Sequence, residues 1–287
     1  MRILITGGDG FVGRYFRRKY AEHDIVNIDI KSGNDARDFF KTDRSKFDLV
    51  IHLAAIVGGR ATIEGDPLSV AVDLAIDSAM FNWAMLTRPG RVVYFSSSAA
   101  YPVFLQSGGP YRLKESDINL DNVASPDYTY GWAKLTGEYL AKFAQEDGLR
   151  VHIFRPFSGY GTDQDLTYPF PSFIKRAKEQ ADPFEIWGDG KQVRDFIHMQ
   201  DIVDAVDEAI RQDVPGPVNL CSGIATSFNE LQYKVTSWVG YKPEVKHLTT
   251  APVGVTYRVG DPTKMLSFYT PKITLNDGIV RALNGQI

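Results

Sequence analysis

Cysteine is nearly missing from this chain, which has a single one, Cys221, among its 287 residues. One cysteine excludes an internal disulfide and a metal site built from several cysteines, and no metal is expected. Such low cysteine usage suits the reducing cytoplasm, which is the expected location. From Met1 the chain enters a predicted strand rather than the charged and apolar segments of a signal peptide. Export by that route is therefore not expected.

Long hydrophobic runs and an excess of one charge are missing as well. No stretch approaches the roughly 18 consecutive apolar residues of a membrane span, so no membrane partner is expected. The 32 basic and 35 acidic residues give a formal net charge of −3, which provides no overall attraction to nucleic acid. An anionic ligand must then be bound by local arginines and backbone dipoles, and a small-molecule partner is favoured.

What the chain does have is a regular alternation of short apolar runs and segments of helical period. Strands are predicted at 3–6, 25–29, 49–53, 92–96, 151–155 and 217–220, and long helices at 68–86 and 128–146. This alternation predicts an α/β fold with a Rossmann-like, doubly wound parallel sheet. After Arg155, glycines and prolines interrupt a looser region, where a small C-terminal lobe is expected.

Three glycines follow the first predicted strand at once. Gly7, Gly10 and Gly13 have the spacing Gly-x-x-Gly-x-x-Gly, and Phe11 and Val12 open the helix that comes next. A diphosphate approaches the backbone closely only where side chains are absent, and a helix N-terminus then offers it unpaired N–H groups. An ordinary glycine turn is the alternative. The order of strand, turn and helix favours a dinucleotide site.

The ends of the next two strands suit the rest of a dinucleotide. Asp29 ends the second strand, where a carboxylate accepts hydrogen bonds from the adenosine ribose and repels a 2′-phosphate, so NAD is favoured over NADP. Lys31 counts against the preference for NAD. The alternative role for Asp29 is that of a solvated aspartate in a turn. Asp35 and Ala36 are expected to border the adenine. Small residues at the end of the third strand let the cofactor pass: Leu53, Ala54 and Ala55.

Tyr130 and Lys134 lie one turn apart at the start of the helix predicted at 128–146. This spacing puts phenol and ammonium on one face, and a nearby cation stabilises phenolate. Lys134 is therefore expected to lower the pKa of Tyr130 from about 10 toward neutrality and make it a usable base. The alternative is that the two residues are no catalytic pair, with the ring of Tyr130 packed in the fold and Lys134 solvated. Ser97, in a serine cluster after the fourth strand, can donate to the same substrate oxygen, unless these serines only form a turn.

Six motifs, taken in order, resemble the extended short-chain dehydrogenase/reductases that act on nucleotide sugars. They are the glycine turn, His52-Leu-Ala-Ala, Ser96-Ser-Ser, Tyr130-x-x-x-Lys134, Arg155-Pro-Phe and Trp187-Gly-Asp-Gly-Lys-Gln-Val-Arg-Asp-Phe-Ile-His. The resemblance covers nearly the whole chain, and the ordered set is highly specific. It implies a tightly held NAD. We expect an NAD-binding Rossmann domain at 1–157, completed by part of 190–225, and a substrate-binding lobe at 158–189 and 226–287.

The resemblance also implies roles for single residues in the reaction. Tyr130 is similar to the family's general base. Lys134 is similar to the residue that lowers the pKa of that base and holds the nicotinamide ribose. Ser97 corresponds to the family's hydroxyl donor, and Ser98 is expected to assist on the substrate side.

Two arginines resemble those with which the family clamps the sugar-nucleotide diphosphate. They are Arg194 and Arg258, whose planar guanidinium groups suit such a ligand. Surface ion pairs with the neighbouring Asp195 and Asp261 are the alternative. Ser158 stands where many relatives have a substrate-binding asparagine, so it is a further candidate on the substrate side.

The residues after Ser97 bear on the type of reaction. The 4,6-dehydratases that resemble this chain carry an Asp-Glu pair there, whereas this chain has Ser98 and Ala99, so dehydration is disfavoured. Several stretches resemble GDP-mannose 3,5-epimerases, but Ala99 replaces their catalytic cysteine and Tyr168 their lysine. Ser97, Tyr130 and Lys134 with NAD remain. They suffice to oxidise a sugar to its 4-keto form and to return hydride to the opposite face of this intermediate.

The expected function is therefore NAD-dependent epimerisation of a nucleotide-diphosphate hexose at C4. A 4-keto-sugar reductase or a dehydratase of the same family is one alternative, and a non-catalytic Rossmann protein that senses the dinucleotide is another. The resemblance also implies a homodimer, formed through the helices predicted at 68–86 and 128–146. Packing of both helices on their own sheet alone is the alternative.

Overall fold

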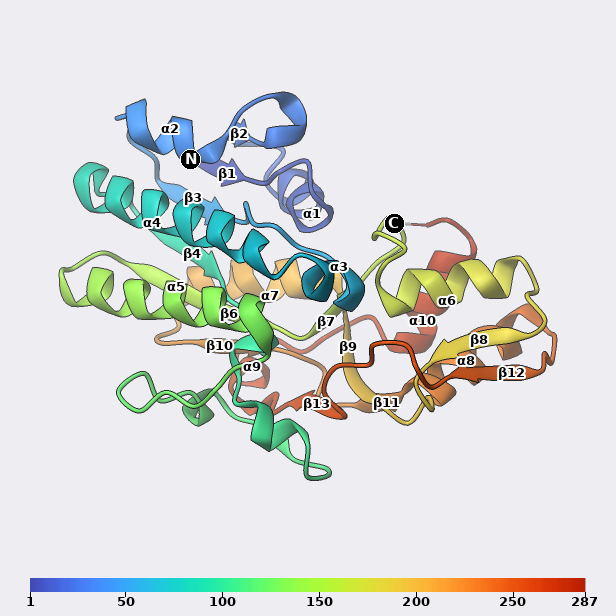
Figure 1. Ribbon diagram of the computed structural model, residues 1–287. Coiled ribbons are helices and arrows are strands. Elements are labelled where there is room, and N and C mark those ends of the chain that lie inside the picture. Colours follow the sequence, from blue (N-terminus) through green and yellow to red (C-terminus); the bar gives the residue numbers. More distant parts are fainter. Residues whose placement is uncertain (287) are drawn as a thin grey trace.

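The protein consists of a larger and a smaller layered part (Figure 1). The structure is a computed structural model that describes residues 1–286, without the side chains of residues 61–63. A six-stranded sheet with helices on both faces forms the larger part. The smaller part contains α6 (Pro169–Lys178), α8 (Phe228–Val239) and α10 (Leu275–Leu283).

All neighbouring strands of the large sheet are parallel, in the order β10-β6-β4-β3-β1-β2. The strands are β1 (Arg2–Thr6), β2 (Asp24–Ile28), β3 (Leu49–His52), β4 (Val92–Phe95), β6 (Val151–Pro156) and β10 (Val218–Leu220). After β2 the chain crosses back over β1 to β3, so the strand order reverses between β1 and β3. Ligands of such sheets bind at the carboxyl ends of the strands at this point. The predicted doubly wound α/β fold is confirmed.

Side chains of each strand alternate between two apolar cores. Ile3 and Ile5 belong to one core and Leu4 to the other, as the two-residue period of a strand requires. The helices on the first face are α1 (Phe11–Lys19) and α7 (Met199–Arg211), and those on the second are α2 (Ala36–Thr42), α4 (Val70–Thr87) and α5 (Tyr128–Glu146). Because both faces are covered, the strands consist of nearly continuous apolar residues.

Most predicted boundaries differ from the observed ones by one or two residues, and two of these differences have a clear cause. The helix predicted at 68–86 begins only at Val70, because Pro67 starts a separate 3₁₀ turn, Pro67–Ser69, before it. The second strand ends at Ile28, and Asp29 caps the 3₁₀ turn that follows. The helix predicted at 128–146 matches α5 residue for residue.

A buried polar network attaches α5 to the sheet. Glu138 of α5 accepts two hydrogen bonds, of 2.8 and 2.6 Å, from the guanidinium of Arg155 on β6, and these side chains are only 1% and 2% exposed. Arg155 also donates to the Tyr101 hydroxyl (3.1 Å), which donates to Asn219 of β10 (2.6 Å). Ser96, which follows β4, donates to Glu138. The network therefore fixes α5 relative to the carboxyl ends of three strands.

The smaller part has an apolar core of its own, in which Phe173 and Phe184 contact each other edge to face. A second sheet, with the order β11-β9-β13-β5 and β7 paired to β9, connects the two parts. Its strands are β5 (Arg112–Leu113), β7 (Ser158–Tyr160), β9 (Val193–His198), β11 (Ala225–Ser227) and β13 (Tyr257–Gly260). The remaining strands and helices are β8 (Phe184–Trp187), β12 (Val245–Leu248), α3 (Arg60–Gly65) and α9 (Thr263–Leu266). Within residues 1–286, no helix combines the length and apolar composition needed to cross a membrane.

Removal of the Glu138 carboxylate is expected to destabilise the fold. Glu138→Ala leaves Arg155 as a buried charge without its counter-ion, which costs about 3–5 kcal/mol of the free energy of unfolding. Urea unfolding followed by circular dichroism measures this loss. The matched control is Lys142→Ala on the same helix, whose ion pair with Asp121 is exposed and contributes about 1 kcal/mol or less. Equal losses in the two variants would contradict the role given to the network.

Candidate active site

The glycine turn has the geometry that a diphosphate requires. Gly7 has a φ of +73°, which favours glycine, and a Cβ on Gly13 would lie 2.3 Å from the Gly7 carbonyl oxygen. Gly10 caps α1 without a side-chain hydrogen bond, so the first N–H groups of the helix, from Phe11 and Val12 onward, can bind an anion. The residues present therefore fit the diphosphate of a dinucleotide.

The end of β3 lies directly against this turn. The Leu53 N–H donates to the Thr6 carbonyl oxygen at 3.0 Å, and a Cβ on Gly7 would come within 2.9 Å of the Ala54 nitrogen. The structure thus brings the predicted residues Leu53 and Ala54 to the glycine turn, with Ala55 next in the chain. The lack of a side chain at Gly7 is what allows the close approach.

Asp29 is fixed beside the glycine turn. Its carboxylate accepts hydrogen bonds from the N–H groups of Asp9 and Lys31, both at 2.8 Å. Each carboxylate oxygen can accept a further bond, so the bonds to the turn leave room for a ribose hydroxyl. Asp35 instead caps α2 and pairs with Arg37, and Ala36 is buried in the core. That these two residues border the adenine stays a prediction.

Ser97, Tyr130 and Lys134 come together from β4 and α5. Ser97 follows β4 and accepts a hydrogen bond from the Ala99 N–H at 3.0 Å, which orients its hydroxyl. The phenol of Tyr130, in the first turn of α5, lies near enough to this hydroxyl for Ser97 to lower the pKa of Tyr130. The Lys134 ammonium lies one turn further on, 5.8 Å from the centre of the Tyr130 ring. These three predicted residues are therefore one cluster.

The pKa of Tyr130 does not follow the expectation. Burial raises it above its usual value, and the negative charges of Asp73 and Asp77 raise it further, while the nearby Ser97 hydroxyl lowers it. The prediction that Lys134 lowers the pKa of Tyr130 toward neutrality is therefore wrong. The largest cause of the raised pKa is burial of the phenol, and two buried carboxylates on α4 add to it. This pair was missed, although its signal is visible as two acids four residues apart in a mainly apolar helix.

The two carboxylates on α4 have different surroundings. Burial alone would raise the pKa of Asp77, but Lys134, His52 and Tyr94 together hold it below its usual value. Its two oxygens contact the His52 ring nitrogen Nε2 at 3.1 Å and the Tyr94 hydroxyl at 2.6 Å. Burial raises the pKa of Asp73 to about 6, in spite of Lys134. Asp73 and Tyr130 line the same surface hollow, so this carboxylate borders the reacting group.

Arg194 and Arg258 lie side by side on the parallel strands β9 and β13. Burial and then the charge of Arg258 lower the pKa of Arg194 to about 9. Mutual repulsion between arginines is typical of an anion-binding site. Ion pairs of Arg194 and Arg258 with the adjacent Asp195 and Asp261 are not found in the part of the chain that the structure describes. Asp195 accepts a hydrogen bond from Ser222, and Asp261 accepts one from the N–H of Thr263.

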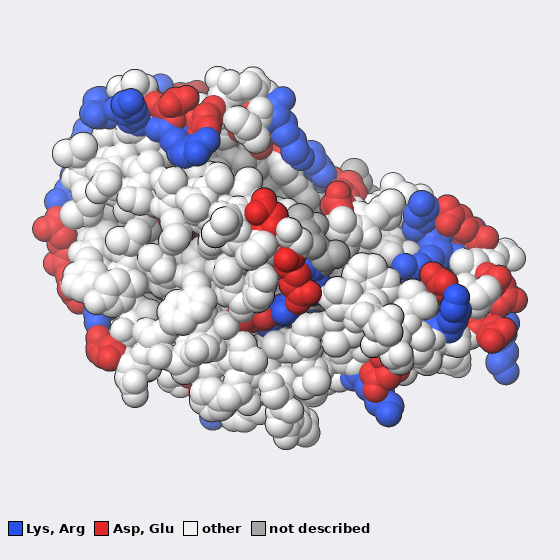
Figure 2. All heavy atoms as spheres, in the orientation of Figure 1, with Lys and Arg blue, Asp and Glu red and all other residues white. Residues whose placement is uncertain are grey.

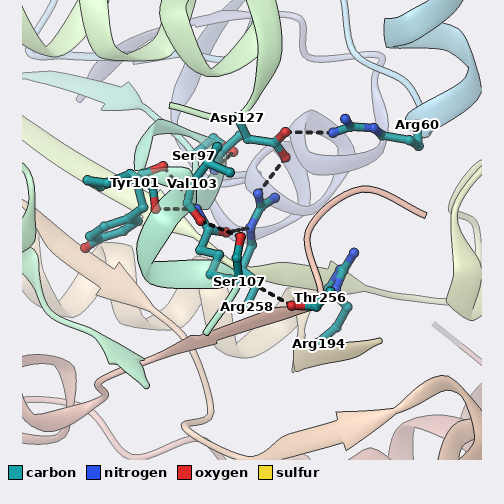
Figure 3. A network of polar contacts seen from close by, with 12 residues as sticks. Arg60, Ser97, Tyr101, Val103, Ser107, Asp127, Arg194, Thr256 and Arg258 are labelled. Carbon is teal, nitrogen blue, oxygen red and sulfur yellow. Dashed lines mark hydrogen bonds and ion pairs between the residues drawn. The ribbon is translucent and has the colours of Figure 1, made fainter. Parts of the chain in front are cut away.

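Arg258 has a partner that the sequence did not predict. Its guanidinium donates to Asp127 at 2.6 Å and to Gln106 at 2.5 Å (Figure 3). On the substrate side, Ser98 is buried in the turn after β4, and Ser158 lies in β7 beside β9. Contact of these two serines with a sugar stays a prediction.

Comparison with known proteins agrees with this geometry. The sequence profile of the NAD dependent epimerase/dehydratase family matches residues 3–221. The chain is 30% identical over 305 residues to GDP-mannose 3,5-epimerase 1 of Oryza sativa subsp. japonica, which covers 97% of this chain and 80% of the relative. It is 26% identical to the dTDP-4-dehydro-6-deoxy-D-allose reductase of a Streptomyces species, over 92% of this chain and 89% of the relative.

A solved structure shows the same fold. The UDP-glucose 4-epimerase of Thermus thermophilus, determined in complex with NAD, superposes with a TM-score of 0.83 at 20% identity, over 100% of both chains. The resemblance noted in the motifs is thus confirmed, and so is NAD as the cofactor of the family. This chain is a member of the NAD dependent epimerase/dehydratase family, whose nucleotide-sugar enzymes include epimerases, dehydratases and reductases.

Proposed function

We propose that the protein is an NAD-dependent 4-epimerase of a nucleotide-diphosphate hexose in the cytoplasm. The observation that carries this proposal is the cluster of Ser97, Tyr130 and Lys134 beside the predicted dinucleotide site. The positions that follow Ser97 hold Ser98 and Ala99, so an acid for the elimination of water is missing from them. Oxidation and reduction at a single carbon need only the cluster and the dinucleotide.

Each side chain has a defined task in this reaction. The Tyr130 phenolate takes the proton from the sugar hydroxyl at C4 and later returns it to the same oxygen. Ser97 donates a hydrogen bond to that oxygen, and Lys134 stabilises the phenolate by its charge. When bound, NAD supplies the hydride acceptor at C4 and a positive charge beside Tyr130. Between the two hydride transfers the 4-keto sugar must turn its other face.

Arg194 and Arg258 are proposed to hold the diphosphate of the substrate. They project from adjacent strands of the second sheet, which connects the smaller part to the active-site edge of the large sheet. An anion between them relieves the repulsion that, together with the larger effect of burial, lowers the pKa of Arg194. The diphosphate thus anchors the nucleotide end while the sugar reaches Tyr130.

Asp73 favours a second candidate function. It is a carboxylate at the hollow that Tyr130 also lines, and burial raises its pKa to about 6. Such a group can exchange protons with a carbon next to a keto group, as a dehydratase or a 3,5-epimerase requires. A deoxy product or exchange at C3 or C5 would identify this function in the product analysis described next.

Tyr130→Phe is expected to abolish conversion of the sugar. Loss of a general base costs about 10²–10⁴ in rate, and proton NMR of the protein with NAD and a panel of UDP-, GDP- and dTDP-hexoses and uronic acids detects the 4-epimer. The matched control is Tyr233→Phe, at an exposed tyrosine of α8. Because Tyr130 acts as phenolate and its pKa is raised, kcat/KM should increase with pH above neutrality. Unchanged turnover by Tyr130→Phe, or stoichiometric consumption of NADPH, would contradict the proposal, and the latter would indicate a 4-keto-sugar reductase.

Gly13→Ala is expected to weaken NAD binding by at least about tenfold. The added Cβ would collide with the Gly7 carbonyl oxygen and with Gly8, so the turn must open and its N–H groups move away from the diphosphate. Isothermal titration calorimetry with NAD measures the change. Gly108→Ala is the control, because a Cβ there meets no atom within 4 Å. NAD affinities equal to those of the unaltered protein in both variants would place the diphosphate elsewhere.

We further propose a homodimer formed through α4 and α5. One side of α5 packs on the sheet, while the opposite side exposes Trp132, Tyr139 and Phe143 by 47%, 44% and 48%. Figure 2 shows the face over α4 and α5 as nearly free of charged side chains, which gather at its rim. An aromatic stripe of this kind suits a self-complementary contact with a second copy of the chain.

Glutamates in the stripe are expected to separate the dimer. Tyr139→Glu combined with Phe143→Glu places like charges in the contact, and sedimentation velocity at micromolar concentration should then show monomers. Tyr233→Glu, at an exposed aromatic residue of the smaller part, should leave the dimer intact. A monomeric unaltered protein would refute this part of the proposal.

A further inference from the structure

Asp127 occupies a position where an aspartate usually caps a helix. It is the residue before α5, but its side chain makes no hydrogen bond to the first turn of that helix. Instead it accepts from Arg60 at 2.7 Å and from Arg258 at 2.6 Å. Figure 3 shows the carboxylate between these two guanidinium groups. The carboxylate oxygens of Asp127 therefore accept hydrogen bonds from arginines, whereas those of a capping residue accept from backbone N–H groups.

The carboxylate of Asp127 stays ionised in this position. Burial alone would raise its pKa, but Arg258 and Arg60 hold it below its usual value. Arg60 stacks over the ring of Tyr128 at 5.6 Å and also pairs with Glu64. At neutral pH, Asp127 is thus a fixed negative charge in a mainly positive cluster.

The charges around Asp127 do not balance. Arg60, Arg194 and Arg258 bring three positive charges, and the carboxylates of Asp127 and Glu64 bring two negative ones. Arg194 donates to the backbone carbonyls of Val193 (2.8 Å) and Val253 (3.1 Å), and the described residues give it no carboxylate partner. An anion that binds Arg194 therefore comes close to the negative charge of Asp127, which is hydrogen-bonded to the neighbouring Arg258.

We propose that Asp127 is a built-in competitor of the diphosphate, whose carboxylate holds Arg258 until a nucleoside diphosphate displaces it. This inference rests on the proposed function, which gives Arg194 and Arg258 to the diphosphate. Two phosphate charges beside an ionised carboxylate repel it, while both compete for the same guanidinium donors. Asp127 thereby sets how tightly the nucleotide is held.

Displacement of Asp127 also has a consequence for the catalytic helix. From its place before α5, the released carboxylate can accept from the N–H groups of Thr129 and Tyr130, as an N-cap does. Tyr128 has a φ of +56°, which is unfavourable for a residue with a Cβ. Capping of α5 by Asp127 therefore favours a rearrangement of this turn. Binding of the diphosphate is thus coupled to the turn that carries the base. Asp127 is a positioning residue in this scheme, not a catalytic one.

The test is calorimetric titration of the NAD-loaded protein with UDP, GDP and dTDP. Asp127→Asn removes the charge and keeps the size, and it should bind the preferred diphosphate about fivefold more tightly or better. Asp127→Ser, which can still cap α5, should do the same, so misfolding of one variant does not remove the test. Asp121→Asn, at an exposed acid that pairs with Lys142, is the control and should bind like the unaltered protein. In turnover, KM should decrease in both Asp127 variants. Asparagine and serine can both cap α5, so both variants should keep kcat, whereas Asp127→Ala, which cannot cap, should lower kcat if capping positions the base.

Two results would overturn the inference, and they are distinguishable. Equal or weaker diphosphate binding by Asp127→Asn and Asp127→Ser, together with at least tenfold weaker binding by Arg258→Ala, would show that Asp127 does not compete, while the proposed function stands. Failure of all three diphosphates to bind the unaltered protein would remove the proposed diphosphate site and the inference with it.

Discussion

The ion pair between Glu138 and Arg155 is the interaction on which the active site depends. Charges this deeply buried are tolerated only when they are paired and fully hydrogen-bonded, and here Ser96 and Tyr101 supply the additional bonds. Because Glu138 lies on the helix that carries Tyr130 and Lys134, the pair sets the distance between that helix and the serine cluster after β4. The proximity of Ser97 to Tyr130 is a consequence of this arrangement. The same network includes Asn219 of β10, so a late segment of the chain helps to position a site built mainly from early ones.

Two groups of opposite charge flank the reacting residues. On the α4 side, Asp73 and Asp77 offset the charge of Lys134 and add to the burial that raises the pKa of Tyr130. On the side of the smaller part, the arginines provide positive charge that Asp127 only partly neutralises. The proposed diphosphate substrate would complement the arginines, and the cationic nicotinamide ring of a bound NAD would complement the carboxylates on α4. The protein therefore gains from its ligands the charges that its own side chains leave unbalanced.

The sequence alone predicted the features that short-range constraints determine. The glycine turn was predicted because the positions of Gly7 and Gly13 are dictated by close backbone contacts within a few residues, and α5 because helical periodicity continues without interruption from 128 to 146. The partners of Arg155 and Arg258 were not predicted, since Glu138 and Asp127 meet them only through the tertiary fold. The prediction for the pKa of Tyr130 was wrong for the same reason: the spacing to Lys134 is local, whereas the burial of the phenol and the carboxylates on α4 come from the tertiary fold.

The most direct test of the central claim is the fate of a deuterium atom at C4 of the sugar. The NAD-loaded protein converts the C4-deuterated nucleotide sugar in ordinary water, and proton NMR then examines the product. Hydride transfer to the dinucleotide and back predicts a 4-epimer that keeps deuterium at C4, with no exchange at C3 or C5. Replacement of the deuterium by solvent hydrogen, or exchange at a neighbouring carbon, would contradict the account and show that proton transfer at carbon accomplishes the change.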